Sequence, residues 1–159
     1  MCYIVCMKIE QGHVYKEHNK SALLYHLVCP VRYRRKAITE DVEKTIVSTC
    51  AEISQRYEIH FTEIGTDIDH VHFLIQSVPV LSPKQIAQTV KSIIAREVFT
   101  HHPDVKKMLW GGKFWTSGYY INTVGLYGGK DMIQQYVKHQ GNNTYKQIHI
   151  DTLQLSLFT

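Results

Sequence analysis

Residues 57–78, YEIHFTEIGTDIDHVHFLIQSV, hold two segments of alternating apolar and polar residues, joined by a short polar stretch. A period of two is typical of half-buried β-strands, and the range Gly65 to Asp69 supplies turn-forming residues between them. We therefore predict a β-hairpin that turns over Gly65 to Asp69. On its first strand the alternation places Glu63 on the face of Phe61 and Ile64 on the opposite face.

Amphipathic helices are predicted on both sides of this hairpin. Residues 38–57, ITEDVEKTIVSTCAEISQRY, carry apolar residues at helical spacing after Thr39, which we expect to be the N-cap. Residues 82–99, SPKQIAQTVKSIIAREVF, begin with Ser82, a proline and Gln85, which together form a capping-box signature. Each segment has one apolar stripe, so both helices are expected to pack on a sheet.

Further elements complete the predicted fold. Residues 21–31 form an apolar strand, and residues 111–125 form a last strand after a loop that contains Pro103. Residues 131–140 have the spacing of a short helix, and residues 153–158 alternate as an edge strand would. The order strand, helix, strand, strand, helix, strand predicts an α+β fold: a ferredoxin-like, RRM-like βαββαβ sandwich with an antiparallel sheet, plus the C-terminal helix.

The composition fits one globular domain. With 159 residues, 44% apolar and 20% charged, the chain can bury a core of its own. We expect one domain over residues 1–159, with a core at about 21–142, an N-terminal extension at 1–20 and a C-terminal tail at 143–159. No apolar run approaches the roughly 20 residues of a membrane span, and the first residues lack the features of a signal peptide, so a cytoplasmic protein without a membrane partner is expected. The four cysteines form no C-x-x-C pair, which favours reduced, mostly buried thiols.

Basic residues are concentrated in two stretches, although the formal net charge is only +4. The sequence RYRRK spans residues 32–36, and Lys113 precedes Phe114 and Trp115. Cations mixed with aromatic rings suit single-stranded nucleic acid, whose phosphates and unpaired bases they can contact. A solvated surface loop explains the charge equally well.

His70 and His72 are one residue apart in the second strand of the hairpin. Residues i and i+2 of a strand point to the same side, so the two imidazoles are expected side by side, roughly 7 Å apart at the backbone, where they could hold one metal ion. Two surface histidines would give the same pattern. The helix predicted over residues 131–140 places Tyr136 and Gln140 on one face, so Gln140 could be a third donor, and a core stripe with a buried tyrosine is the structural alternative.

Three blocks of the chain, in this order, resemble the HUH single-tyrosine transposases, the TnpA-type enzymes of insertion sequences that move as single-stranded DNA. The blocks are DHVH at residues 69–72, LWGGKFWTSGYY at residues 109–120, and a late helix with the pattern Tyr-x-x-x-Gln at residues 136–140. The resemblance covers about residues 21–142, and H-x-H alone would be far less specific.

The resemblance implies roles for particular residues. His70, His72 and Gln140 would hold Mg²⁺ or Mn²⁺, and Tyr136 would be the nucleophile that attacks a DNA phosphate. The implied product is a 5′-phosphotyrosine with a free 3′-OH, and a later 3′-OH can reverse the attack without ATP because the bond energy is kept in the ester.

The implied partner is single-stranded DNA with hairpins near the ends of the element. Members of the family are homodimers in which the tyrosine helix of one subunit can serve the histidines of the other, and this sequence does not show which arrangement holds. The residues that we expect to contact DNA lie in the basic and aromatic segments and on the second helix: Arg32, Arg34, Arg35, Lys36, Lys91, Arg96, Lys113 and Trp115.

Three alternatives remain open at this point. A related HUH nuclease that processes chromosomal repeat palindromes or replication origins would use the same chemistry. A non-catalytic ferredoxin-like domain could bind nucleic acid on its sheet, although KFWTSGYY at residues 113–120 does not follow the RNP pattern of aromatic residues. A two-histidine phosphoesterase would resemble a duplicated H-x-T pattern, whereas this chain has a single H-x-H.

Overall fold

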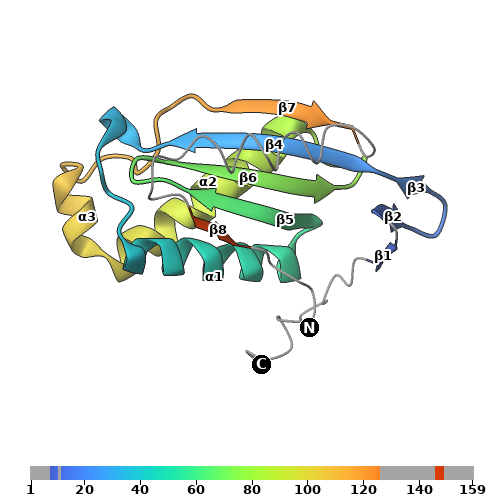
Figure 1. Ribbon diagram of the computed structural model, residues 1–159, viewed down its shortest axis with the longest axis horizontal. Helices are drawn as coiled ribbons and strands as arrows, with labels where there is room; N and C mark the ends of the chain where they lie inside the picture. The colour runs from blue at the N-terminus through green and yellow to red at the C-terminus, as the bar shows by residue number, and fades with distance from the viewer. Residues whose placement is uncertain (1–7, 11, 126–145, 149–159) are drawn as a thin grey trace.

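The computed structural model describes residues 8–10, 12–125 and 146–148 and contains a five-stranded antiparallel sheet with helices on one face (Figure 1). The strand order is β7-β4-β6-β5-β8. The strands are β4 (Leu23–Pro30), β5 (Ile59–Thr66), β6 (His70–Ser77), β7 (Tyr120–Val124) and β8 (Lys146–Ile148). Without β8, this is the βαββαβ order of a ferredoxin-like sandwich, and the predicted fold class is confirmed.

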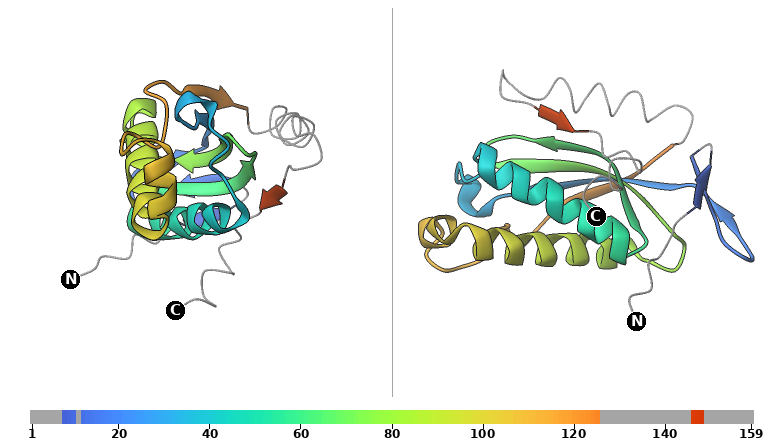
Figure 2. Two further views of the ribbon diagram at one scale, coloured as in Figure 1. Left: turned by 90° about the vertical axis from the view of Figure 1, so that its left-hand side faces the viewer. Right: turned by 90° about the horizontal axis from the view of Figure 1, so that it is seen from below.

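Two long helices cover one face of the sheet, as Figure 2 shows. They are α1 (Glu40–Arg56) and α2 (Pro83–His101), and their apolar stripes join the inward residues of the strands in one core. The Thr39 hydroxyl accepts a hydrogen bond from the Val42 amide at 3.4 Å, so the predicted N-cap is confirmed. Ser82 and Gln85 form the predicted capping box, with bonds of 3.2 and 2.8 Å.

The predicted hairpin is confirmed, but its turn is shorter than predicted, because Gly65 and Thr66 pair with His72 and Val71, and its first strand contains a β-bulge. The register moves from Phe61 opposite Ile75 to Glu63 opposite Leu74, which leaves Thr62 as an extra residue. One extra residue in a strand moves every later side chain to the other face. The predicted faces of Glu63 and Ile64 are therefore wrong: Ile64 is buried in the core beneath the helices, and Glu63 lies on the opposite face.

The segment between α2 and β7 differs from its prediction. Pro103 begins a short helix, α3 (Pro103–Met108), where a loop was expected, and β7 is shorter than the strand predicted over residues 111–125. Phe114 and Trp115 are buried in the core, and an isolated bridge between Val31 and Trp115 connects this stretch to the sheet. Their aromatic side chains gave the stretch its strand-like composition, although they serve core packing.

Residues near the N-terminus form a second, small antiparallel sheet that was not predicted. Its strands are β1 (Lys8–Glu10), β2 (His13–Tyr15) and β3 (Lys20–Ser21), which are too short to show a period. The Gln76 amide donates a 2.6 Å hydrogen bond to the Gly12 carbonyl and so ties this sheet to β6.

Some predictions lie outside the described residues, namely the helix over residues 131–140, the edge strand over residues 153–158, and Cys2 and Cys6. β8 was not predicted. Of the cysteines, Cys29 and Cys50 are free and buried. Within the described ranges, no helix is long and apolar enough to cross a membrane.

Candidate active site

His70 and His72 lie on the face of the sheet opposite to α1 and α2. Along β6 the residues between and beyond them, Val71 and Phe73, are fully buried in the core under the helices, so the alternation of the strand turns the two imidazoles to the other side. Their ring centroids are 4.9 Å apart, with 70° between the ring planes. The predicted juxtaposition of the two histidines on one face is confirmed.

A third histidine, which sequence reasoning missed, contacts His72 of this pair. His26 of β4 lies opposite Leu74, and its Nε2 is 2.9 Å from Nδ1 of His72, with the two rings stacked at 5.2 Å. Burial lowers the pKa of His72 to about 3, with a further contribution from the nearby His70 and His26, and burial also lowers the pKa of His26. Both rings are therefore neutral near pH 7, and one must donate its single N–H to the other.

Each of the two imidazoles has an Nε2 atom that is suited to bind a metal ion. Nε2 of His72 is buried and has no hydrogen-bonding partner within the described part of the chain. If Nδ1–H of His72 donates to His26, this Nε2 keeps its lone pair for a ligand. Asp69 accepts a 2.7 Å hydrogen bond from Nδ1 of His70, which likewise leaves Nε2 of His70 as the available nitrogen.

These residues alone do not complete a metal site. Among the described residues, no group of three or more His, Cys, Asp or Glu side chains could hold a metal ion. The predicted third ligand, Gln140, and the predicted nucleophile, Tyr136, lie outside the described residues. The described geometry therefore supplies two nitrogen donors, whereas a closed or catalytic site commonly has three or more protein ligands.

The comparisons with known proteins identify the family. Residues 19–140 match the family model for IS200-like transposases, a span that includes both histidines and the positions of Tyr136 and Gln140. The chain belongs to the IS200-like transposase family.

Two curated relatives agree with this assignment. The ISDra2 transposase TnpA of Deinococcus radiodurans is 29% identical over 143 residues, which cover 88% of this chain and 97% of the relative. The transposase for insertion sequence element IS200 of Salmonella typhimurium is 28% identical over 123 residues, which cover 77% of this chain and 80% of the relative.

Solved structures share the fold. A crystal structure of a Deinococcus radiodurans protein assigned as a transposase superposes with a TM-score of 0.62 at 28% identity, covering 84% of this chain and 98% of that one. A REP-associated tyrosine transposase bound to a REP hairpin superposes with a TM-score of 0.50 at 7% identity, covering 79% of this chain and 68% of that one, and shows likeness of fold alone.

In this member of the IS200-like transposase family, an ion pair links the basic segment to the histidines. Arg34 Nε is 3.1 Å from one carboxylate oxygen of Asp69, and the other oxygen is the one that contacts His70. Asp69 therefore holds His70 on one side and a cation on the other. Its place directly before the histidine strand was visible in the sequence, but its pairing with Arg34 depends on the tertiary fold.

Glu63 is a second residue that sequence reasoning did not bring to this face. The bulge in β5 turns its carboxylate toward the side of the sheet that carries His72, and its side chain is buried. Glu63 lies opposite Leu74, so it is a diagonal neighbour of His72. A bulge without glycine leaves little sign in the sequence.

The predicted DNA-contacting residues fall into different settings. Arg34, Arg35, Lys36 and Lys113 are exposed, and Arg32 is half-buried and donates to the Tyr33 hydroxyl at 3.0 Å. Their contact with DNA stays a prediction.

The other three predicted DNA-contacting residues, Lys91, Trp115 and Arg96, make contacts within the protein. Lys91 Nζ donates to the carbonyls of Thr116 and Gly118 at 2.9 and 3.0 Å, and Trp115 is buried and donates to the Lys91 carbonyl at 3.1 Å. Arg96 is exposed on α2, the helix that packs on the face opposite to the histidines, and contacts Glu97 at 3.4 Å. A DNA role for these residues also stays a prediction.

Proposed function

We propose that this transposase is a metal-dependent enzyme that cleaves and rejoins single-stranded DNA at hairpin-marked ends of a mobile element. His70, His72 and Gln140 would hold Mg²⁺ or Mn²⁺, and Tyr136 would be the nucleophile. The observation that carries the proposal is the buried Nε2 of His72, which lies beside His70 and has no partner within the described ranges. A buried nitrogen without a partner is costly unless a ligand satisfies it.

The proposed cleavage exchanges one phosphate ester for another. A bound divalent ion would neutralise charge on the non-bridging phosphate oxygens. The Tyr136 oxygen forms a bond to phosphorus as the bond to the 3′ oxygen breaks; the phenol loses its proton, and the 3′ oxygen gains one. The products are a 5′-phosphotyrosine and a free 3′-OH. Because the number of ester bonds is unchanged, attack by a new 3′-OH rejoins a strand without ATP.

The histidine environment supports this use of the site. Asp69 orients His70, and His26 orients His72, so the rings are fixed before any ligand arrives. The lowered pKa of His72, about 3, means that protons do not compete for its nitrogen near neutral pH.

A second candidate is the processing of chromosomal repeat palindromes by the same chemistry. The fold likeness to a REP-associated tyrosine transposase bound to a REP hairpin raises this possibility. The curated relatives at 28 and 29% identity are transposases of insertion sequences, so we favour mobilisation of an element. Subterminal palindromes flanking the reading frame would support mobilisation.

The test is a covalent-adduct assay. Single-stranded hairpin DNA labelled at its 3′ end, which lies on the fragment that stays joined to Tyr136 through its 5′ phosphate, is incubated with the protein and Mn²⁺, and the adduct is separated on a denaturing gel. The wild-type protein and a Tyr57→Phe control are expected to form it, whereas Tyr136→Phe is not. Adduct formation by Tyr136→Phe at the wild-type level would remove Tyr136 as the nucleophile.

A further inference from the structure

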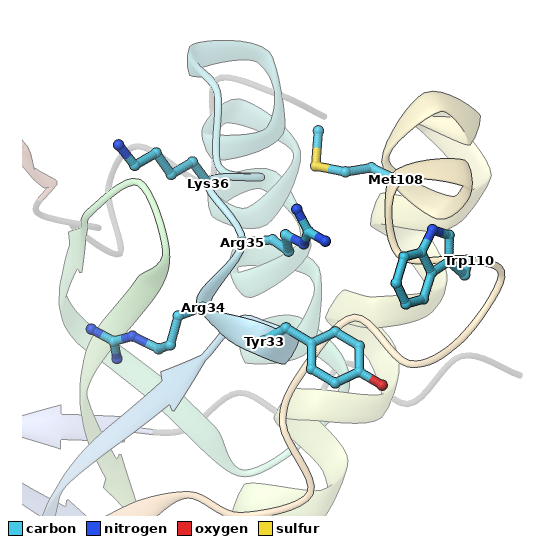
Figure 3. A pocket seen from close by; sticks show the side chains of 6 residues that line it. All are labelled: Tyr33, Arg34, Arg35, Lys36, Met108 and Trp110. Atoms are coloured by element: carbon cyan, nitrogen blue, oxygen red, sulfur yellow. The ribbon is translucent and has the colours of Figure 1, made fainter.

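A cavity of about 870 Å³ lies between the segment that follows β4 and the residues at the end of α3 (Figure 3). Its lining residues are aromatic or cationic except for one methionine: Tyr33, Arg34, Arg35, Lys36, Met108 and Trp110. We propose that this cavity, the Tyr33–Trp110 pocket, binds an unpaired nucleobase of single-stranded DNA together with a neighbouring phosphate. This inference rests on the proposed function, since it gives a place to the DNA strand that the function requires.

The aromatic rings of the pocket are open to solvent and close together. Tyr33 is 59% exposed and Trp110 is 78% exposed, and their ring centroids lie 6.2 Å apart. The exposure of these two rings contrasts with Phe114 and Trp115, which are buried a few residues away. Every base has a flat π-face, so two such rings suit an unpaired base of any sequence.

The backbone holds these rings outward in an uncommon conformation. Tyr33, Arg34 and Trp110 have φ angles of 58°, 51° and 53°, in the left-handed region that residues other than glycine seldom adopt. Tyr33 and Arg34 belong to the 3-10 helix η1 (Arg32–Arg34), where the Arg34 amide donates to the Val31 carbonyl at 2.9 Å. Strained residues of this kind cluster at ligand sites, where the surrounding structure fixes them.

Hydrogen bonds fix the Trp110 side of the pocket as well. The Trp110 amide donates to the Lys107 carbonyl at 3.0 Å, and the Gly112 amide donates to the Leu109 carbonyl at 3.0 Å. Both walls are thus set by backbone bonds, so the pocket is formed before a ligand binds. A preformed site avoids part of the ordering cost of binding.

The charge of the pocket favours a nucleotide over an apolar ligand. Arg34, Arg35 and Lys36 line it, and none of the described lining residues is a carboxylate, although Arg34 is paired with Asp69 beside the pocket. The Arg35 guanidinium lies 5.9 Å from the centre of the Trp110 ring, and Figure 3 shows it directed toward that side of the pocket. Cations beside stacking rings match the phosphate and base of one nucleotide. In duplex DNA the bases are stacked inside, so the ligand must be single-stranded.

The pocket is connected to the histidine site. Figure 3 shows Arg34 directed away from Trp110, and its Nε contacts Asp69, which contacts His70. A strand whose base occupies the pocket therefore lies two side-chain contacts from a proposed metal ligand. We infer that the pocket holds the DNA strand so that the phosphate to be cleaved lies close to the histidines.

The test compares two DNA probes on the full-length protein. One is a short single-stranded oligonucleotide, and the other has the same length and phosphates with abasic residues in place of its nucleotides. Trp110→Ala and Tyr33→Ala should weaken binding of the normal strand by about tenfold and change binding of the abasic strand by less than about twofold. Trp110→Phe, which keeps a stacking ring, should bind the normal strand nearly as the wild type does.

Control experiments distinguish the loss of base stacking from a general loss of folding or of DNA binding. Tyr57→Ala removes a 43% exposed tyrosine at the far end of α1 and should leave both affinities unchanged. A 2-aminopurine probe should be quenched by the wild type and less by Trp110→Ala. Equal weakening for both probes, or no weakening for either, would overturn the assignment of the pocket.

The adduct assay distinguishes this inference from the proposed function. Trp110-dependent binding of the normal strand without any Tyr136 adduct would support the pocket and contradict the proposed function. Adduct formation with binding that does not depend on Trp110 or Tyr33 would contradict the pocket and support the proposed function.

Discussion

At the scale of single residues, His26 governs which nitrogen of His72 is free. Its Nε2 contacts Nδ1 of His72 at 2.9 Å, and when Nδ1–H of His72 is the donor of this bond, Nε2 of His72 keeps its lone pair for a ligand. We expect His26→Leu to weaken Mn²⁺ binding by about 10- to 100-fold, because His72 loses the partner that fixes its tautomer and ring orientation. Titration of the metal-free protein with Mn²⁺, followed by EPR, measures this.

Two matched variants make the His26 experiment specific. His26→Gln keeps an acceptor for Nδ1–H of His72 and should recover part of the Mn²⁺ affinity. His101→Leu removes an exposed histidine of α2 and should have no effect. Unchanged Mn²⁺ affinity in His26→Leu would show that His26 does not position His72.

At the scale of elements, the bulge in β5 shows where sequence reasoning succeeded and where it failed. The hairpin, both long helices and their caps were predicted, because apolar period and capping chemistry are local properties. The bulge was missed because Thr62 is an ordinary strand residue and nothing local marks it as extra. Its effect is nonlocal: it moves Glu63 to the histidine face and Ile64 into the core.

Deletion of Thr62 should be tolerated for this reason. Phe61 already pairs with Ile75 and Glu63 with Leu74, so removing Thr62 gives a regular ladder with the same faces. The main expected loss is the 3.0 Å hydrogen bond from the Thr62 hydroxyl to the Leu74 carbonyl, a cost of about 1 kcal/mol in the free energy of unfolding. Urea denaturation measures it.

A deletion on the other side of the bulge is the comparison. Removing His60 shifts Ile59, which is buried, out of its register with Ser77 and should destabilise the protein far more. If the two deletions destabilise the protein equally, the bulge is needed for folding, and the hypothesis that Thr62 can be removed without loss of the strand register is wrong.

The connection between α2 and β7 gives another prediction at this scale. Lys91 donates to the carbonyls of Thr116 and Gly118, so we expect its charge to hold this loop in place. Lys91→Met should lower the free energy of unfolding by about 1–2 kcal/mol, since the carbonyls lose a charged donor. Thermal unfolding of the variant measures this.

Arg96→Met is the matched control for Lys91. Arg96 is on the same helix with a 66% exposed side chain, and its loss should leave stability nearly unchanged. An equally small effect for Lys91→Met would contradict the anchoring role. Weaker DNA binding at unchanged stability would instead support the predicted DNA contact.

At the scale of the whole molecule, the candidate site combines segments that are distant in the chain. His70 and His72 could be predicted because strand alternation alone puts them together. His26 is 46 residues from His72 in sequence, and Arg34 meets Asp69 across the sheet end, so only the strand order joins them. The basic character of RYRRK could be predicted from the sequence. Which of its residues forms an ion pair and which line the pocket could be seen only in the folded structure.

The arrangement of subunits gives the last prediction. In a homodimer, Tyr136 can act with His70 and His72 of its own subunit or with those of the other subunit, and the second arrangement makes a specific prediction. A His70→Ala protein and a Tyr136→Phe protein, each inactive alone, should then form adduct when mixed, because a mixed dimer contains one intact composite site. With random exchange in equal amounts, half the dimers are mixed and about a quarter of all sites are intact, so about a quarter of the wild-type adduct is expected. Mixed dimers verified by differential tags but without adduct would show that each site uses the tyrosine and histidines of one chain.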